Sequence, residues 1–270
     1  MHSGILTPRR ARREPVTPVV ELPEVTLVAA TSVAMPQTVR AMVLSLEQAR
    51  FGAAILFCHR PPSVGTPACI VWRQIEPIES HAAYSRFMLH DLRRHVATSH
   101  VLCVQWDGYV LDGRRWDPGF LDYDYIGAPW PQFGDGHVVG NGGFSLRSRR
   151  LLDACHALGI DESPEDVAIC RTHRSTLESR FAIRFAPEDV ARRFAFERHA
   201  SSGDEFGFHG VFNLAGLVDP RQMNDIITDL DPMVLNRLEH RELFRLALRR
   251  GNLRLAWKVL RRLRQGADRR

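Results

Sequence analysis

Short apolar runs alternate with segments of helical spacing through residues 25–111, and this alternation restricts the chain to few folds. The strand-like runs cover residues 25–32, 53–59, 68–75 and 100–111. The segments with helical spacing cover residues 35–50 and 80–97. Strands that are apolar on both faces and separated by helices are typical of a mainly parallel sheet covered on both sides. We therefore predict an α/β fold with a mixed, mostly parallel sheet flanked by helices.

Capping residues mark where two of the predicted helices begin. Ser80 suits the N-cap of the helix over residues 80–97, because a serine hydroxyl accepts a free N–H of the first turn. A further helix is predicted over residues 163–180, with Ser163 as its N-cap and Pro164 at its first position.

The charge of the chain comes from arginine. The formal net charge is +5, and Lys258 is the only lysine. The basic residues gather in PRRARR near the start and RRLRQGADRR at the finish. Basic ends alone are weak evidence for nucleic-acid binding, since arginine equally suits the phosphates of a nucleotide. We do not expect a nucleic-acid partner.

Cysteine usage and hydropathy indicate a cytoplasmic location. The five cysteines are scattered, without a CxxC pair or zinc spacing, and most lie inside apolar runs, as reduced core residues do. The N-terminus lacks the apolar stretch of a signal peptide, and no run approaches the length of about 18 apolar residues that a membrane span needs. We expect residues 1–20 to be a flexible basic segment.

Ligands of parallel sheets gather at the carboxyl ends of the strands, and here the run VLCVQ is followed by Trp106 and Asp107. Asp-Gly is also an ordinary turn signal, so Asp107 has a structural reading as well. The next segment, WDPGFLDYDYIGAPW over residues 116–130, is rich in aromatic and acidic residues. Rings suit the apolar faces of a sugar and carboxylates suit its hydroxyls, so these residues favour a polyhydroxylated ligand.

A glycine-rich stretch, GNGGFSLRS, begins at Gly140. It is not a P-loop, because no Lys-Ser or Lys-Thr follows, and it lacks the GxGxxG order of a Rossmann fingerprint. Bare backbone allows close approach of a ligand or a positive φ, and a β-bulge or tight corner explains it equally well. The ligand interpretation leaves room for a sugar beside Asn141, Gly142 and Gly143.

Two acidic residues, Glu165 and Asp166, open the predicted helix over residues 163–180. Their charges favour the helix dipole, which is sufficient reason for their position. A carboxylate beside a glycine-lined pocket is also well placed to take a proton from an acceptor hydroxyl. The spacing leaves both interpretations open.

The blocks VLCVQWDGYVL, FLDYDYIGAPW, VGNGGFSLRSRRLL, PEDVAIC, IRFAPEDVARRFAFE and FGFHG resemble the bacterial family of domains of unknown function 5672, whose members are regarded as glycosyltransferase-like. The resemblance covers residues 25–215. More distantly, the chain is similar to β-1,3- and β-1,4-galactosyltransferase-like enzymes of GT-A fold. The resemblance implies a GT-A-like, Rossmann-like sheet with a C-terminal helical extension.

The resemblance also implies site residues. GT-A enzymes present an Asp-x-Asp that binds a divalent ion and the donor diphosphate; Gln105, Trp106 and Asp107 occupy that place, so one carboxylate remains. His209 stands where a late metal-binding histidine is expected, and the implied ion is Mn²⁺ or Mg²⁺, held in part by water and phosphate oxygens. Asp166 matches the catalytic base and Glu165 its neighbour.

Other contacts are implied for the donor and the acceptor. The expected donor contacts are Thr31, Ser32, Arg40, Tyr84, Arg86, Gln105 and Asp107. The expected acceptor or sugar pocket consists of Trp130, Asn141, Gly142 and Gly143. The mechanism requires the carboxylates of Asp107 and Asp166 to converge on opposite sides of one glycine-lined cavity.

The sequence and its family resemblance therefore favour a hexosyltransferase-like glycosyltransferase that moves a sugar from a nucleotide-sugar donor to a saccharide or glycoconjugate acceptor. The alternative is a carbohydrate- or nucleotide-binding protein of the same fold without turnover, because the Asp-x-Asp is incomplete. We divide the chain into residues 1–20, a glycosyltransferase domain over 21–218 and a helical extension over 219–270.

The C-terminal segment, residues 238–265, has apolar residues at helical spacing, interrupted by Gly251 and Asn252. Two helices are therefore expected there. Their arginines either are solvated on a packed hairpin or meet an anionic membrane surface or lipid-linked acceptor. The second reading makes the protein peripheral to the inner face of the membrane.

Overall fold

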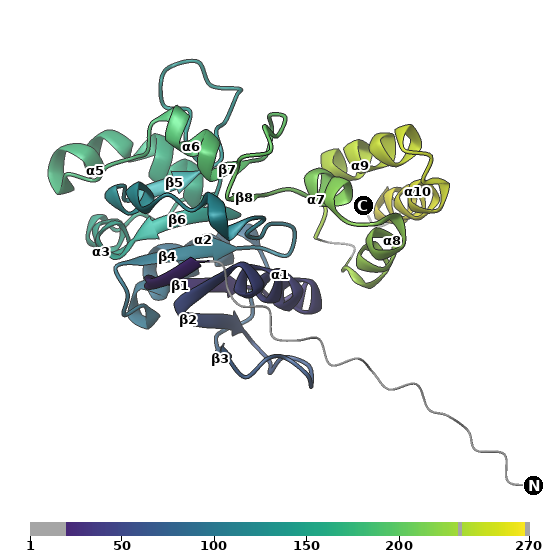
Figure 1. Cartoon of the computed structure of the whole chain (residues 1–270), viewed down its shortest axis with the longest axis horizontal. Helices are drawn as coiled ribbons and strands as arrows, with labels where there is room; N and C mark the ends of the chain where they lie inside the picture. The colour runs from purple at the N-terminus through teal and green to yellow at the C-terminus, as the bar shows by residue number, and fades with distance from the viewer. Residues whose placement is uncertain (1–19, 232–233, 268–270) are drawn as a thin grey trace, which may run out of the picture.

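The computed structural model describes residues 20–231 and 234–267, with side chains through residue 263. The predicted flexible segment over residues 1–20 lies outside the described residues, apart from Val20. Six strands form the central sheet in the order β3-β2-β1-β4-β6-β5 (Figure 1). Their bounds are β1 Val20–Ala30, β2 Ala49–Cys58, β3 Ile70–Gln74, β4 His100–Val104, β5 Tyr125–Gly127 and β6 Phe144–Ser148. A second, two-stranded sheet pairs β7 (Ala195–Phe196) with β8 (Gly207–Phe208).

The helices surround the central sheet and form a separate group at the C-terminal end of the chain. Their bounds are α1 Met35–Gln48, α2 His81–Arg86, α3 Arg149–Leu158, α4 Glu165–Val167, α5 Arg174–Phe181, α6 Glu188–Phe194, α7 Val211–Leu217, α8 Pro220–Asp229, α9 Arg237–Arg249 and α10 Leu253–Ala267. A π-helical turn (Phe87–Asp91) and a 3₁₀ turn (Leu92–His95) continue α2. Ser80 caps α2 as predicted, because its hydroxyl accepts the Ala83 N–H at 3.1 Å.

The strands β3, β2, β1 and β4 are parallel, whereas β6 runs antiparallel to β4 and to β5. Successive side chains of β1 enter different cores: Leu27 packs in the cluster that contains α1 and α6, and Val28 packs against Phe87 and Leu92 after α2. This alternation is the period of two that a strand buried on both faces requires. The predicted mixed, mostly parallel α/β class is confirmed.

The strand predicted over residues 100–111 ends at Val104, so its second half is wrong. The Gly108 N–H donates to the Gln105 carbonyl at 3.2 Å and turns the chain out of the sheet. Val110 then forms an isolated bridge with Gly207 of β8, and the Leu111 N–H donates to the Phe206 carbonyl at 2.8 Å. These apolar residues are buried by the second sheet, which an apolar run alone cannot reveal.

The helix predicted over residues 163–180 is divided into α4, a π-helical turn (Ala168–Thr172) and α5. The predicted cap by Ser163 and the predicted helical position of Pro164 are also wrong. Pro164 is extended and precedes the helix, and the Glu165 N–H donates instead to the Ser85 hydroxyl at 3.1 Å. The cap of α4 therefore comes from α2, a partner 80 residues away in the sequence.

The helices α7–α10 share a core of their own and stand to one side of the sheet (Figure 1). Two helices, α9 and α10, meet at Gly251 and Asn252, as predicted. The core of α7–α10 also contains Trp106, Tyr109 and Phe208 from the part of the chain before α7, which we call the sheet unit. Helix α7 precedes the predicted boundary at residue 218 but packs within this core, and the division of the chain stays a prediction. None of the described helices has the length and apolar character needed to cross a membrane.

All five cysteines carry free thiols. Cys58, Cys103, Cys155 and Cys170 are buried, as expected for core residues, whereas Cys69 is exposed. The apolar core rather than covalent links therefore holds the described part of the chain together.

Candidate active site

Two chain segments leave the central sheet at the same edge because β6 is antiparallel to β4. Val104, the last residue of β4, pairs with Phe144, the first residue of β6. Gln105 to Asp107 follow β4, and Asn141 to Gly143 precede β6, so both segments emerge side by side. The sheet topology thus joins the predicted donor segment to the predicted sugar pocket.

The two glycines face different groups of protein atoms. A Cβ on Gly142 would lie 2.5 Å from Glu165 Oε1 and 3.4 Å from the Asp166 Cβ. A Cβ on Gly143 would overlap the imidazole ring of His209. The glycines therefore make room for the protein's own side chains, rather than for a sugar as we expected from the sequence.

Asn141 fixes the conformation of this loop. It has a positive φ of 65°, a region that asparagine tolerates better than other non-glycine residues. Its Oδ1 accepts the Gly143 N–H at 2.9 Å, and its carbonyl accepts the Tyr125 hydroxyl at 3.1 Å. Trp130 is buried and its ring lies where a Cβ of Gly140 would be. Trp130 therefore supports the loop from within the core, and its contact with a sugar stays a prediction.

On one side of the loop, His209 lies between two carboxylates. Its Nε2 is 3.4 Å from Asp107 Oδ1, and its Nδ1 is 3.3 Å from Glu197 Oε1. Burial alone would lower the pKa of His209, but the charges of Asp107 and Glu197 raise it well above the ordinary value. The two carboxylates therefore favour the protonated form of His209.

Glu197 shows the reciprocal effect. Burial alone would raise its pKa, but the hydrogen bond and positive charge of His209, together with Arg198, lower it below the ordinary value. Gln105 completes the group, with its Oε1 3.3 Å from His209 Nε2. Gln105, Asp107 and His209 were predicted from the sequence, but Glu197 was not, because it follows β7 and belongs to no local motif.

This group does not fit a divalent cation as it lies. Both ring nitrogens of His209 lie within 3.4 Å of a carboxylate oxygen, so neither faces an open position for an ion. Within residues 20–231 and 234–267, no three His, Cys, Asp or Glu side chains form a set that would hold an ion. The Mn²⁺ or Mg²⁺ implied by the family resemblance stays a prediction, and the proposed sugar transfer is described without it.

On the other side of the loop, Asp166 is half-buried and held by backbone donors. Its Oδ2 accepts the Gly142 N–H at 2.9 Å, and its Oδ1 accepts the Val167 N–H at 2.8 Å. Burial, followed by the charge of Glu165, raises the pKa of Asp166, while the Gly142 hydrogen bond and Arg147 offset part of this effect. Asp166 thus contacts Gly142, whereas Asp107 contacts His209, whose ring occupies the Cβ position of Gly143. The convergence of Asp107 and Asp166 on one cavity stays a prediction.

Glu165 is held by a buried cation. Its Oε1 is 2.9 Å from an Nη of Arg147, whose side chain is 0% exposed. Ser85 donates to its Oε2 at 3.4 Å. Arg147 also donates from Nε to the Ser145 hydroxyl at 3.0 Å. Arg147 and Ser85 were not predicted from the sequence. An arginine within the apolar run FSLRS nevertheless indicates that a buried acidic partner is needed.

Some predicted donor contacts have protein partners of their own. The Thr31 hydroxyl accepts the Ala34 N–H at 3.2 Å, and the Ser32 hydroxyl accepts the Ile78 N–H at 2.8 Å. Arg40 lies 5.9 Å from the centroid of the Tyr109 ring. Thr31 and Ser32 therefore shape the turn after β1, while the guanidinium of Arg40 lies close to the segment after Asp107.

The predicted pair Tyr84 and Arg86 is divided between two environments. Tyr84 lies against the sheet near Arg147 and Glu165, and burial, followed by the charge of Glu165, raises its pKa well above the ordinary value. Arg86 is exposed and lines a separate cleft of about 510 Å³ with Glu76, Asp91 and His95. The structure does not bring Arg86 to the Asp107 side of the loop.

Replacing Gly143 by alanine is expected to lower the free energy of unfolding by about 1–3 kcal/mol, because the added Cβ must displace His209 from between its two carboxylates. Gly134→Ala is the matched control, since no atom lies near its Cβ position and its φ is not positive. Urea unfolding of both variants measures the difference. Equal stabilities would show that His209 moves without cost.

Comparison with known proteins places these residues within a family match. A family model described as a protein of unknown function, DUF5672, matches residues 71–209. That range contains Asp107, Asn141, Asp166 and His209. A search of curated proteins returned no match to the chain.

Two solved glycosyltransferase structures align with the chain. One is the crystal structure of a glycosyltransferase involved in the glycosylation of the major capsid of PBCV-1, 13% identical, with 68% of this chain and 92% of that chain covered and a TM-score of 0.44. The other is galactosyltransferase LgtC in complex with donor and acceptor sugar analogs, 13% identical, with 81% and 100% covered and a TM-score of 0.40. Neither alignment is close enough to carry a statement about the site.

Proposed function

The chain belongs to the DUF5672 family, and from that membership and the geometry of the site we propose that it is a glycosyltransferase. It moves a sugar from a nucleotide-sugar donor to a hydroxyl group of a saccharide or glycoconjugate acceptor. The observation that carries the proposal is that Asp166 accepts the Gly142 N–H, while the His209 ring, 3.4 Å from Asp107, occupies the Cβ position of the adjacent Gly143. Transfer needs a proton acceptor on one side of the reacting carbon and polar donor contacts on the other.

Asp166 is the proposed base. Its two backbone hydrogen bonds orient the carboxylate, and each oxygen keeps a lone pair for an acceptor hydroxyl. A raised pKa brings the basicity of the group closer to neutral pH, where a general base is more effective. The hydroxyl loses its proton to Asp166 as its oxygen attacks the anomeric carbon, and the bond from that carbon to the diphosphate breaks.

Asp107 is the proposed donor contact. Its Oδ1 is buried and accepts no hydrogen bond from the described residues. The Nε2 atom of His209 lies 3.4 Å away and forms an ion-pair contact only. A buried acceptor without a donor is rare in native proteins, and a hydroxyl of the donor ribose or sugar supplies one. We propose that this contact orients the donor.

The departing diphosphate needs positive charge nearby. The group around His209 contains two carboxylates for one imidazole ring, so it does not supply this charge. Arg40 is the arginine we propose for this role, because its guanidinium lies over Tyr109, two residues after Asp107. An arginine fork binds phosphate oxygens through two parallel hydrogen bonds.

A screen of sugar nucleotides for thermal stabilisation, with and without Mn²⁺, tests the proposal. A donor that binds only the folded state raises the melting temperature by roughly 5–10 °C at a hundredfold excess over its Kd. We expect Asp107→Asn to lose this response and Asp122→Asn, an exposed aspartate outside the site, to keep it.

The outcomes of the screen separate the two functions. No response to any sugar nucleotide, with or without Mn²⁺, would contradict the proposal. A response without sugar transfer to any acceptor would instead support the alternative, a carbohydrate- or nucleotide-binding protein of the same fold. The two arms with and without Mn²⁺ test the predicted metal separately.

A further inference from the structure

The surface of the α9–α10 hairpin has a narrow composition. Every exposed residue between positions 237 and 263 is an arginine, a leucine, a tryptophan or a glycine. The exposed arginines are Arg237, Arg241, Arg245, Arg249, Arg250, Arg254 and Arg261. The exposed apolar residues are Leu238, Leu248, Leu253 and Trp257. We call these two groups together the hairpin surface.

The arginines of the hairpin surface have no acidic partner among the described residues. The two acidic residues of the hairpin, Glu239 and Glu242, are both half-buried. Glu242 pairs with Arg198, which lies outside the hairpin. None of the arginines of the hairpin surface forms an ion pair with a described acidic side chain. They therefore present an uncompensated positive charge to an anionic partner.

Other cations of the hairpin hold the fold instead. Lys258 donates to the Asn224 carbonyl at 3.0 Å, and Arg262 donates to the Leu230 carbonyl at 2.7 Å. Both bonds fasten α10 to the end of α8. The remaining arginines have no such role, apart from Arg250, which donates to the Ala215 carbonyl at 2.7 Å.

Large apolar side chains lie among these arginines at the turn of the hairpin. Leu248 and Leu253 are 47% and 69% exposed on either side of Gly251, and Trp257 follows one helical turn later at 61%. Arg261 lies one further turn along, 5.6 Å from the Trp257 ring centroid. Exposed leucine and tryptophan cost free energy in water, and they are typical of helices that lie in a membrane interface.

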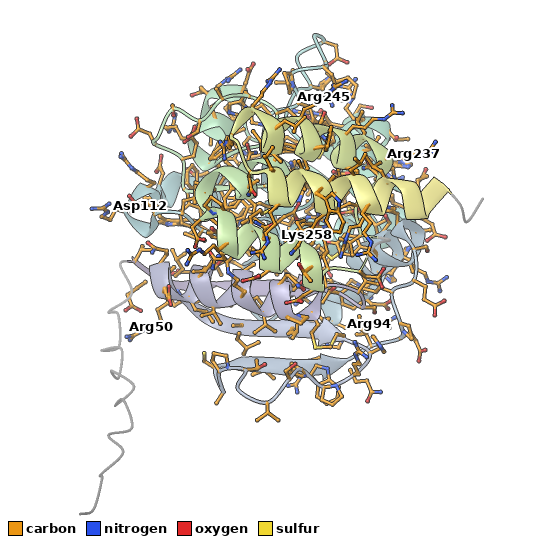
Figure 2. The ribbon with its side chains drawn as sticks, turned by 90° about the vertical axis from the view of Figure 1, so that its right-hand side faces the viewer. Arg50, Arg94, Asp112, Arg237, Arg245 and Lys258 are labelled. Carbon is orange, nitrogen blue, oxygen red and sulfur yellow. The ribbon has the colours of Figure 1, made fainter. Side chains whose placement is uncertain are left out.

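The hairpin also has suitable access. Helices α9 and α10 stand on the side of the molecule away from β3 and α5 in Figure 1. Figure 2 looks onto that side, with Arg237 and Arg245 on α9 and Lys258 on α10 in front of the sheet unit. A flat partner can therefore approach the hairpin without meeting the sheet.

We propose that the hairpin surface binds an anionic lipid bilayer. Leu248, Leu253 and Trp257 enter the boundary between headgroups and acyl chains, and the arginines contact lipid phosphates. A nucleic acid would match the charge but gives no reason for exposed leucines. This inference stands independently of sugar transfer.

Co-sedimentation of the full chain with lipid vesicles tests the proposal. We expect binding to vesicles of mixed phosphatidylcholine and phosphatidylglycerol, and none to phosphatidylcholine alone. Arg254→Gln with Arg261→Gln should weaken the partition by about 10–30-fold, since each arginine near an anionic surface contributes a factor of roughly three to five. Leu253→Ser with Trp257→Ser should weaken it by about tenfold or more, because the buried apolar area is lost.

Arg50→Gln with Arg94→Gln is the matched control. Both arginines are exposed on the sheet unit, away from the hairpin (Figure 2), and their loss changes the net charge by the same amount. All variants keep residues 1–19, so any contribution of the basic N-terminus is constant. The control should bind as the unchanged protein does.

Three results would overturn the proposal. They are absence of binding to the mixed vesicles, equal binding to phosphatidylcholine alone, and a loss that follows the arginines but not Leu253 and Trp257. The last result would indicate a polyanion rather than a bilayer. Thermal unfolding shows whether each variant is folded.

A second measurement locates the contact without disturbing the apolar surface. Brominated lipids should quench the fluorescence of the unchanged protein, and Trp257→Phe should bind equally while losing that quenching. Quenching that persists in Trp257→Phe would place the bilayer at another tryptophan and contradict the proposal.

Discussion

Replacing Asp166 by asparagine is expected to lower the rate of sugar transfer by about 10²–10⁴-fold, the usual contribution of a general base. The amide oxygen of asparagine can still accept the Gly142 N–H, so the loop should keep its conformation. Donor binding depends on the Asp107 side of the loop and should be retained. Transfer assays and donor titrations measure the two effects separately.

The chain offers a matched control for this variant. The tetrapeptide Pro-Glu-Asp-Val occurs at residues 164–167 and again at 187–190. Asp189 in the second copy opens α6, is largely exposed and lies 3.5 Å from Arg193. Asp189→Asn should leave transfer unchanged. If both variants kept full activity, Asp166 would not be the base.

The pH dependence of transfer has a defined direction. Burial and the charge of Glu165 raise the pKa of Asp166, so this group takes up a proton at a higher pH than an ordinary aspartate. The ionised form is the base, and the rate should therefore fall on acidification at a higher pH than an unperturbed aspartate would cause. In Glu165→Gln this acidic limb should move to lower pH, because the neighbouring negative charge is gone.

Replacing Arg147 by methionine is expected to lower the free energy of unfolding by about 3–5 kcal/mol. Arg147 is fully buried on β6, and its loss leaves the carboxylate of Glu165, also buried, without its cation. The cost is large because a lone charge in the core loses its hydration without compensation. Urea unfolding followed by circular dichroism measures it.

A double variant separates the charge effect from packing. Arg147→Met with Glu165→Gln removes both charges, and it should recover much of the stability lost in the single variant. Arg114→Met is the surface control, because Arg114 is 77% exposed in its pair with Asp112, and such a pair contributes about 1 kcal/mol or less. A loss below about 1 kcal/mol in Arg147→Met itself would show that water reaches Glu165.

The elements with regular hydropathy could be predicted from the sequence alone. The strands β1, β2 and β3 and the helix α1 lie within a few residues of their predicted bounds, except that β1 begins earlier, at Val20. Ser80 and the break at Gly251 also follow local rules, because a cap and a turn depend on neighbours within four residues. The errors, at Val104 and Ser163, arise where a distant segment supplies the partner.

The candidate site divides in the same way. Asp107, Asn141, Asp166 and His209 were named from motifs and from the family resemblance, and they do lie around one loop. Arg147 and Ser85, which hold Glu165, and Glu197, which holds His209, were missed. Each of them acts on a residue at least 12 positions away, beyond the reach of any local pattern.

The sequence by itself determined the α/β class, most element positions and the basic, apolar hairpin, because periodicity and capping are properties of neighbouring residues. The antiparallel course of β6, the buried pair of Arg147 and Glu165, and the position of His209 between two carboxylates were decided only in the tertiary structure. A buried charge must have a partner, but which partner it has depends on how distant segments pack.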